Sequence, residues 1–357
     1  MYKSALEILN IIENNGFRAY IVGGFVRDYI MKIKSCDIDI CTDALPMDLI
    51  NIFPNSIFPK EKYGAVIVYN NNIKFEITTF RKELKYINRK PIEIEYITDL
   101  KEDVLRRDFT INSLCMDKNS NIIDYYNGID DINNKIVRCL GDIDIKLKED
   151  PLRILRAIRF ATILNFKLES NLESKIKEYS YLLKNISYDR KRNELDKIFS
   201  SVNVSYGIKL LSSISEYLDI NLDNIKLTKD ILGIWAQVDI GYYNFTKNEK
   251  DIIENIRKIV NNTTISKMDI YKYGLYVVLI ASSILGINKD VITKLDHSLT
   301  IRNRSDINIT SNEIIDLLGR PGKWINDVYN DLEENLINNS LKNENSVIKD
   351  YIIKKYG

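Results

Sequence analysis

The chain has 357 residues, of which 45% are hydrophobic and 28% charged, and its formal net charge is +1. This composition is typical of an ordinary soluble globular protein, and the length predicts more than one domain. The four cysteines form no C-x-x-C pair and His297 is the single histidine, so we expect no zinc centre, disulfide framework or histidine-activated nucleophile.

The N-terminal segment predicts an amphipathic helix over residues 4–15 rather than a targeting sequence. It lacks the apolar stretch of a signal peptide. The longest apolar run, residues 274–287, is too short to span a bilayer and predicts a buried helix. We therefore expect a cytoplasmic protein without a membrane partner. The small net charge does not exclude nucleic acid, because phosphate binding needs only a local basic surface.

The next segment predicts a phosphate-binding turn between a strand and a helix. Residues 19–22 are apolar and β-prone, Gly23 and Gly24 follow, and residues 26–31 have helical character. Glycine allows the backbone to approach a ligand closely, and a helix start directs free N–H groups at a phosphate. Gly24 and Arg27 are therefore candidate nucleotide-binding residues.

Residues 36–41 alternate between polar and apolar, which predicts a strand. Residues two apart on a strand project from the same face, about 6.6 Å apart, so Asp37 and Asp39 converge. Two carboxylates on one rigid face can hold Mg²⁺, and we expect them to be the catalytic metal ligands. A calcium loop starting at Asp37 is excluded, because its fifth, sixth and twelfth positions are Cys41, Thr42 and Asp48.

These motifs, Gly23 to Asp28 followed by Asp37-Ile38-Asp39, resemble the head motif of the bacterial class II CCA-adding enzymes, tRNA nucleotidyltransferases of the polymerase-β-like superfamily. The resemblance implies template-independent addition of CCA to the 3′ end of tRNA from CTP and ATP, by two-metal in-line transfer that releases pyrophosphate. It also implies an α+β fold, with a mixed or antiparallel sheet in the head and an all-helical remainder. The expected divisions are a catalytic head over 1–140, a neck with the base template over 141–200, a body over 201–270 and a tRNA-binding tail over 271–357.

Several alternatives share these features. An A-adding tRNA nucleotidyltransferase or a poly(A) polymerase carries similar head motifs. A noncatalytic tRNA-binding protein with a relict site belongs to another class, which the intact pair of aspartates argues against. A small-molecule nucleotidyltransferase is disfavoured because it has no need of the long helical half.

Residues 65–69 and 73–78 predict an antiparallel hairpin joined by three asparagines. Glu76 on the second strand is either a third carboxylate beside the aspartates or an exposed strand residue. The charged stretch over 80–90 has no clear period and predicts a surface loop. It resembles the family's flexible loop for addition of the terminal A, which favours CCA or A addition.

Residues 105–114 resemble the family's R-R-D-F-T-I-N-A-L motif, with Ser113 in place of alanine. The resemblance implies phosphate binding by Arg107, with Arg106 as a weaker candidate, and ribose recognition by Asp108. Residues 124–138 resemble the hinge between head and neck.

Residues 149–160 predict a helix with Asp150 as its N-cap and Pro151 at its first position. At about 100° per residue, three arginines fall on the face opposite the apolar stripe. Arginine forks bind phosphates and base edges in pairs of hydrogen bonds. The stretch resembles the family's E-D-x-x-R motif, which implies that Asp150 and Arg153 pair with the incoming base, while Arg156 and Arg159 hold the triphosphate or stack.

The remaining motifs predict binding rather than catalysis. Residues 187–195 resemble the family's neck motif, with Asp189 in place of the usual glutamate. Helical periodicity dominates after about residue 200. The turn over 317–325 resembles the tail that grips the tRNA elbow, and a simple interhelical turn is the alternative.

Overall fold

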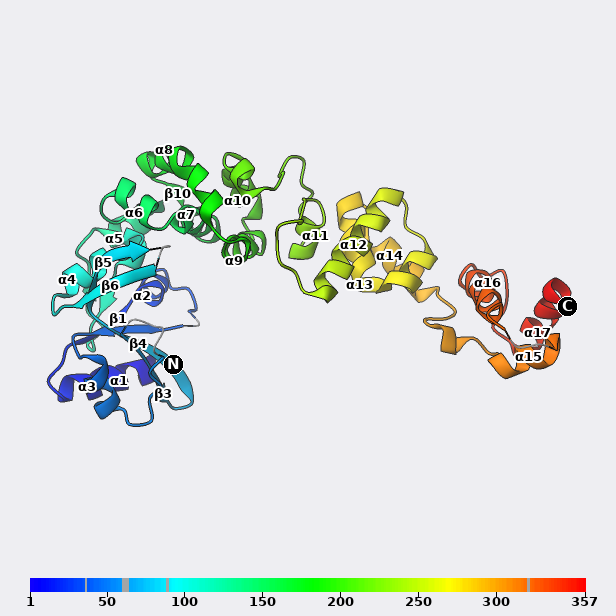
Figure 1. The fold of residues 1–357 in the computed structure, drawn as a ribbon, viewed down its shortest axis with the longest axis horizontal. Coiled ribbons are helices and arrows are strands. Elements are labelled where there is room, and N and C mark those ends of the chain that lie inside the picture. Colours follow the sequence, from blue (N-terminus) through cyan, green and yellow to red (C-terminus); the bar gives the residue numbers. More distant parts are fainter. Residues whose placement is uncertain (36, 60–63, 88–89, 320–321) are drawn as a thin grey trace. The chain divides into compact units, whose positions relative to one another are not determined.

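The computed structural model describes residues 1–35, 37–59, 64–87, 90–319 and 322–357 (Figure 1). It divides into two compact units, Met1–Asp219 and Ile220–Gly357. The strands lie in the first unit, and the second unit consists of helices. This confirms the α+β class. The finer division into head, neck, body and tail stays a prediction.

The first unit is built on a six-stranded sheet in the order β3-β4-β2-β1-β7-β8. The predicted hairpin of β3 and β4 is antiparallel, as expected, whereas β2 and β4 run parallel. In Figure 1, helices α1 (Tyr2–Asn14) and α3 (Pro46–Ile52) lie on one side of the sheet and α2 (Gly24–Ile30) lies on the other. The strands are β1 (Ala19–Val22), β2 (Asp39–Thr42), β3 (Ala65–Asn70), β4 (Ile73–Thr79), β7 (Cys115–Met116) and β8 (Ile122–Ile123).

The register of three adjacent strands places two acidic residues beside the end of β1. Val22 is the last residue of β1, its partner on β2 is Asp39, and the partner of Asp39 on β4 is Glu76. Directly paired residues point to the same face of a sheet. The predicted strand over 36–41 was three residues too early, because β1 ends at Val22 and gives no partner to the residues before Asp39. Cys36 lies outside the described residues.

The expected surface loop over 80–90 is wrong as a description of the backbone. Strands β5 (Arg81–Ile87) and β6 (Lys90–Tyr96) form an antiparallel two-stranded ribbon. A ribbon outside the main sheet does not need an alternating apolar face, so the hydrophobic period that signals a strand is missing from its sequence.

Helices α6 and α7 follow the sheet and meet at Asp150. Helix α7 begins at Leu152, so Pro151 rather than Asp150 occupies the N-cap position. The carboxylate of Asp150 still accepts a hydrogen bond from the Leu152 N–H at 3.3 Å, which is the capping contact that the sequence predicted. The other elements of this part are α4 (Leu100–Leu105), α5 (Gly128–Asn133), β9 (Ile136–Val137), α6 (Ile143–Glu149), α7 (Leu152–Leu164), β10 (Lys167–Leu168), α8 (Ser170–Tyr179), α9 (Tyr188–Phe199) and α10 (Val204–Ser212).

The second unit contains α13 (Lys267–Leu285), which packs with α12 and α14. By length and composition alone, α13 is the one helix among the described residues that could cross a membrane. Gly274, with φ of 79°, interrupts it, and Val277, Val278 and Ile280 beyond the break are buried. Helix α13 is therefore kinked, and its buried residues contribute to the packing of the second unit. The other helices are α11 (Ile231–Trp235), α12 (Lys247–Asn262), α14 (Lys289–His297), α15 (Ser311–Leu318), α16 (Ile325–Ile337) and α17 (Asn345–Tyr356).

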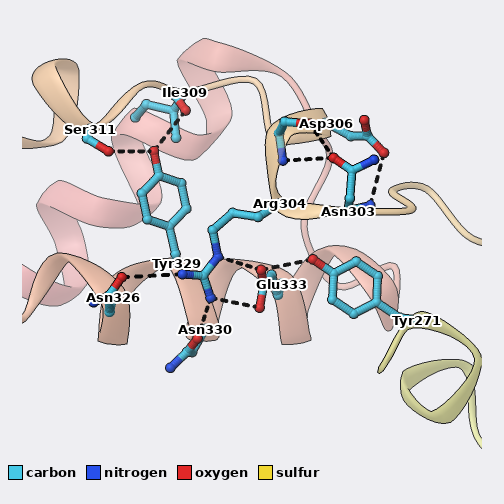
Figure 2. A network of polar contacts seen from close by, with 11 residues as sticks. Tyr271, Asn303, Arg304, Asp306, Ile309, Ser311, Asn326, Tyr329, Asn330 and Glu333 are labelled. Carbon is cyan, nitrogen blue, oxygen red and sulfur yellow. Dashed lines mark hydrogen bonds and ion pairs between the residues drawn. The ribbon is translucent and has the colours of Figure 1, made fainter. Parts of the chain in front are cut away.

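A polar network joins three segments of the second unit (Figure 2). The Arg304 guanidinium donates to both carboxylate oxygens of Glu333 on α16, at 2.7 and 3.2 Å, and the Tyr271 hydroxyl of α13 donates to the same carboxylate at 2.9 Å. Such a two-pronged contact between charged groups fixes orientation as well as distance. The network therefore holds α13, α16 and the segment around Arg304 together. In the predicted turn over 317–325, residues 320–321 lie outside the described residues.

Candidate active site

One cavity of about 570 Å³ lies in the first unit and gathers segments that are far apart in the sequence. Seven arginines and four carboxylate residues line it, so its charge favours an anionic ligand. The lining residues are Gly23, Gly24, Arg27, Asp39, Arg81, Glu83, Arg106, Arg107, Asp108, Asn112, Asp150, Leu152, Arg153, Arg156, Phe160 and Arg190.

The two-glycine turn forms one edge of the cavity. Gly23 has φ of 81°, in the left-handed region that favours glycine, and its N–H donates to the Leu114 carbonyl at 3.1 Å. A Cβ at this position would lie 3.1 Å from Nη1 of Arg107. Glycine here thus allows both the sharp exit from β1 and the close approach of an arginine.

Arg27 is held from two sides. Its Nε and Nη2 donate to the Asp28 carboxylate at 2.9 and 2.7 Å, and its Nη1 donates to Oδ1 of Asn112 at 2.7 Å. Only 8% of the residue is exposed. An arginine fixed in this way presents its charge to the cavity in one orientation.

Asn112 continues this network to helix α7. Its Nδ2 donates to Oδ1 of Asp108 at 3.2 Å, and the other oxygen of Asp108 accepts from Nε of Arg156 at 2.7 Å. Burial alone would raise the pKa of Asp108, but the Arg156 charge and hydrogen bond hold that pKa below its usual value. Asp108 is therefore an ionised link between Arg156 and the short 3-10 helix, Thr110–Asn112, that carries Asn112.

Arg107 carries a buried Nε for which no described residue supplies a hydrogen-bond partner. A buried guanidinium nitrogen without a partner is costly in a folded protein. Since Arg107 lines the cavity, a phosphate oxygen of a bound nucleotide is a chemically matched partner.

Asp150 and Arg153 both line the cavity, next to each other at the start of α7. Arg153 is 8% exposed, and its Nη1 donates to the Lys146 carbonyl at 2.7 Å. Arg190 of α9 lies 3.7 Å from the Asp150 carboxylate. Each member of the pair is thus oriented by a neighbouring helix.

The chain is 31% identical to the CCA-adding enzyme of Staphylococcus haemolyticus, over 99% of this chain and 97% of the relative. This chain belongs to the CCA-adding enzyme family. The CCA-adding enzyme of Streptococcus sanguinis is also 31% identical, over 99% of this chain and 98% of that relative. Among solved structures, the Bacillus stearothermophilus CCA-adding enzyme in complex with CTP matches with a TM-score of 0.87 at 25% identity, covering 99% of this chain and 97% of that one.

Three family models match separate segments of this chain. The poly A polymerase head domain matches residues 19–138, and tRNA nucleotidyltransferase domain 2 matches residues 243–352. A third model, described as "Probable RNA and SrmB- binding site of polymerase A", matches residues 165–214. The first match contains the glycine turn and both aspartates, and it ends before α7, so the cavity is built from more than the head segment alone.

Two of the predicted site residues do not line the cavity. Asp37 is exposed and precedes β2, and it is not among the lining residues. Arg159 forms an ion pair with Glu194 of α9 at 2.7 Å, outside the lining. The remaining predicted site residues all line the cavity. They are Gly24, Arg27, Asp39, Arg107, Asp150, Arg153 and Arg156.

Six lining residues were overlooked as site residues although they lie within the quoted stretches: Arg81, Glu83, Asn112, Leu152, Phe160 and Arg190. The signal for Asn112 was its place in the same short motif as Arg107 and Asp108. Phe160 follows Arg156 by four residues, so the two share one face of α7. That spacing was available in the sequence.

Proposed function

We propose that this chain adds C, C and A to the 3′ end of tRNA, using CTP and ATP and releasing pyrophosphate. The observation that carries the proposal is one cavity, lined by Asp39, by arginines from five segments of the chain and by the pair of Asp150 and Arg153. The names of the full-length relatives favour CCA addition over addition of A alone. The CTP in the Bacillus stearothermophilus structure supports CTP as a substrate here.

The pair of Asp150 and Arg153 has the chemistry to accept C and A and to reject U and G. Cytosine and adenine each present an amino donor beside a ring-nitrogen acceptor, whereas uracil and guanine present an oxygen acceptor beside a ring N–H donor. An ionised carboxylate only accepts hydrogen bonds and a guanidinium only donates them. Asp150 therefore receives the amino group, and Arg153 donates to the ring nitrogen.

Arg27, Arg107 and Arg156 are proposed to bind the triphosphate. The tRNA 3′ oxygen bonds to the α-phosphorus, the bond to the bridging oxygen breaks on the opposite side, and pyrophosphate leaves with the electron pair. The hydroxyl proton passes to water. Fixed guanidinium groups stabilise the charge that develops on the phosphoryl oxygens, because they need no reorganisation during the reaction.

The metal proposed for this site is Mg²⁺, held by Asp39 together with Asp37. The described residues contain no group of three or more His, Cys, Asp or Glu side chains placed to hold a metal ion. Mg²⁺ is usually held by one or two carboxylates plus substrate phosphates, so two aspartates are enough for the proposed site. When bound, the metal would lower the pKa of the attacking hydroxyl and neutralise charge on the leaving oxygens. Asp39 is the better supported ligand, because it lines the cavity.

The cytoplasm is the proposed location. Cys41, Cys115 and Cys139 are free and buried, which fits a reducing compartment.

The test is incubation of the purified chain with Mg²⁺ and tRNA transcripts that end before CCA, at C or at CC. CTP, ATP or both are supplied, and products are resolved at single-nucleotide length. Completion of CCA on every transcript supports the proposal. Extension of the CC-ended transcript alone by one A would make the chain an A-adding enzyme, and long A tails would make it a poly(A) polymerase.

A further inference from the structure

Three arginine side chains converge on the ring of Phe160. The guanidinium carbons of Arg159, Arg27 and Arg156 lie 4.2, 5.3 and 5.7 Å from the ring centroid. Arg156 and Arg159 belong to α7, as Phe160 does, whereas Arg27 comes from α2. Phe160 is therefore a point where α2, which carries Arg27, contacts α7, which carries Arg153.

An aromatic side chain suits position 160 for a physical reason. Guanidinium groups gathered at one place repel one another, and the negative face of an aromatic ring attracts cations within about 6 Å of its centroid. Each arginine also has an acidic partner: Asp28 for Arg27, Asp108 for Arg156 and Glu194 for Arg159. The ring supplies an attractive surface between these three pairs without adding a negative charge that would repel a triphosphate.

The ring is itself held in place while remaining open to the site. Phe109, which is fully buried, meets it edge to face with centroids 5.7 Å apart and planes at 76°. Phe160 is half-buried and lines the cavity. A leucine would fill much of the same volume but would lack the aromatic face.

We infer that Phe160 is a positioning residue for nucleotide binding, which holds Arg27 and Arg156 at the spacing that a nucleoside triphosphate requires. This deepens the proposed function and rests on it. Because Phe160 acts on the arginines rather than on the base, its loss should weaken the binding of CTP and ATP equally. A residue that read the base would instead change the preference between the two nucleotides.

The test compares Phe160→Leu with Phe160→Tyr in the full chain, with Phe166→Leu as the matched control. Phe166 is a buried phenylalanine just beyond α7 and is not a lining residue of the cavity. Calorimetry with CTP or ATP and Mg²⁺ gives Kd without requiring turnover, and circular dichroism melting checks that each variant folds. Extension of a transcript that ends before CCA gives kcat and KM for CTP, and extension of a CC-ended transcript gives them for ATP.

Phe160→Leu is expected to raise Kd and KM for both nucleotides about 10-fold, with kcat changed less than about threefold. Phe160→Tyr, which keeps the aromatic face, should stay within about twofold of the parent. Phe166→Leu should lower the melting temperature without this change in KM. The inference is overturned if Phe160→Leu binds both nucleotides normally, if Phe160→Tyr is equally impaired, or if Phe166→Leu gives the same rise in KM. If the parent chain binds CTP but does not extend tRNA, the proposed function fails, and the calorimetric comparison still decides the role of Phe160.

Discussion

Asp39 of β2 stands directly opposite Glu76 of the parallel strand β4, so the two acidic residues share one face of the sheet. This register supports the prediction that Glu76 is a third carboxylate beside Asp39, the proposed metal ligand. We expect Glu76→Gln to lower kcat about 10- to 100-fold, since partners of metal ligands typically contribute that much. Nucleotide Kd should change little. Lys74→Gln, at an exposed position on the same strand, is the control. A Glu76→Gln variant with full activity would show that Glu76 is only a strand residue.

The glycine turn makes a second prediction. Gly23→Ala would strain a left-handed backbone and press a methyl group toward Nη1 of Arg107, so KM for CTP should rise about 10-fold. Gly16→Ala is a matched control, because Gly16 has φ of 89° and its Cβ would meet nothing within 4 Å. Steady-state kinetics measures the change in KM, and melting curves measure the loss of stability that the strained backbone causes. Equal KM values for both variants would contradict the role given to the Gly23 and Arg107 contact.

Base selection depends on the shape of the Arg153 side chain as well as on its charge. Arg153→Lys keeps the charge but loses the planar fork, so discrimination of CTP against UTP should fall at least about 10-fold. Arg138 is not among the lining residues of the cavity, so Arg138→Lys should leave the discrimination of CTP against UTP unchanged. Competition between the two nucleotides on one tRNA transcript measures the ratio. Unchanged discrimination in Arg153→Lys would remove Arg153 from the base-reading role.

The second unit should lose stability in acid partly through Glu313. Contacts from Lys349, Thr310 and Asn345 lower the pKa of Glu313 to about 2. A group with a lowered folded-state pKa stabilises the fold above its unfolded pKa of about 4.3, and this stabilisation is lost as pH falls toward the folded value.

Glu313→Gln should therefore show less acid dependence than the parent between about pH 4.5 and 2. Both tryptophans, Trp235 and Trp324, lie in this unit, so tryptophan fluorescence during urea unfolding reports on it directly. Asp290→Asn, on α14, is a surface control. Parallel pH curves for Glu313→Gln and the parent would exclude the assigned contacts as the cause.

Short motifs in the sequence predicted most of the cavity, because each has local physical consequences. Two glycines after an apolar run predict a strand and a tight turn, and the structure has β1, Gly23 and α2 there. The arginines of α7 were correctly separated from its apolar stripe, and Arg153 and Arg156 reached the cavity. The order of polar and apolar residues within one element is enough for such predictions.

Pairings between distant segments were harder to predict. The start of β2 depends on where β1 ends, and the ribbon of β5 and β6 depends on pairing between two charged stretches. Asn112, one partner of Arg27, and Glu194, the partner of Arg159, lie on other elements. No local period encodes such contacts, because tertiary packing decides them.

The most direct test of the central claim is CCA synthesis by the parent chain, Asp39→Asn and Asp43→Asn on a tRNA transcript lacking CCA. Asp43 follows β2, pairs with Arg18 and is not a lining residue of the cavity. The parent and Asp43→Asn should add C, C and A and then stop. Asp39→Asn should bind CTP but extend at least about 1000-fold more slowly, since charge stabilisation at the reacting phosphate would be lost. CCA synthesis by Asp39→Asn at the parent rate would contradict the account.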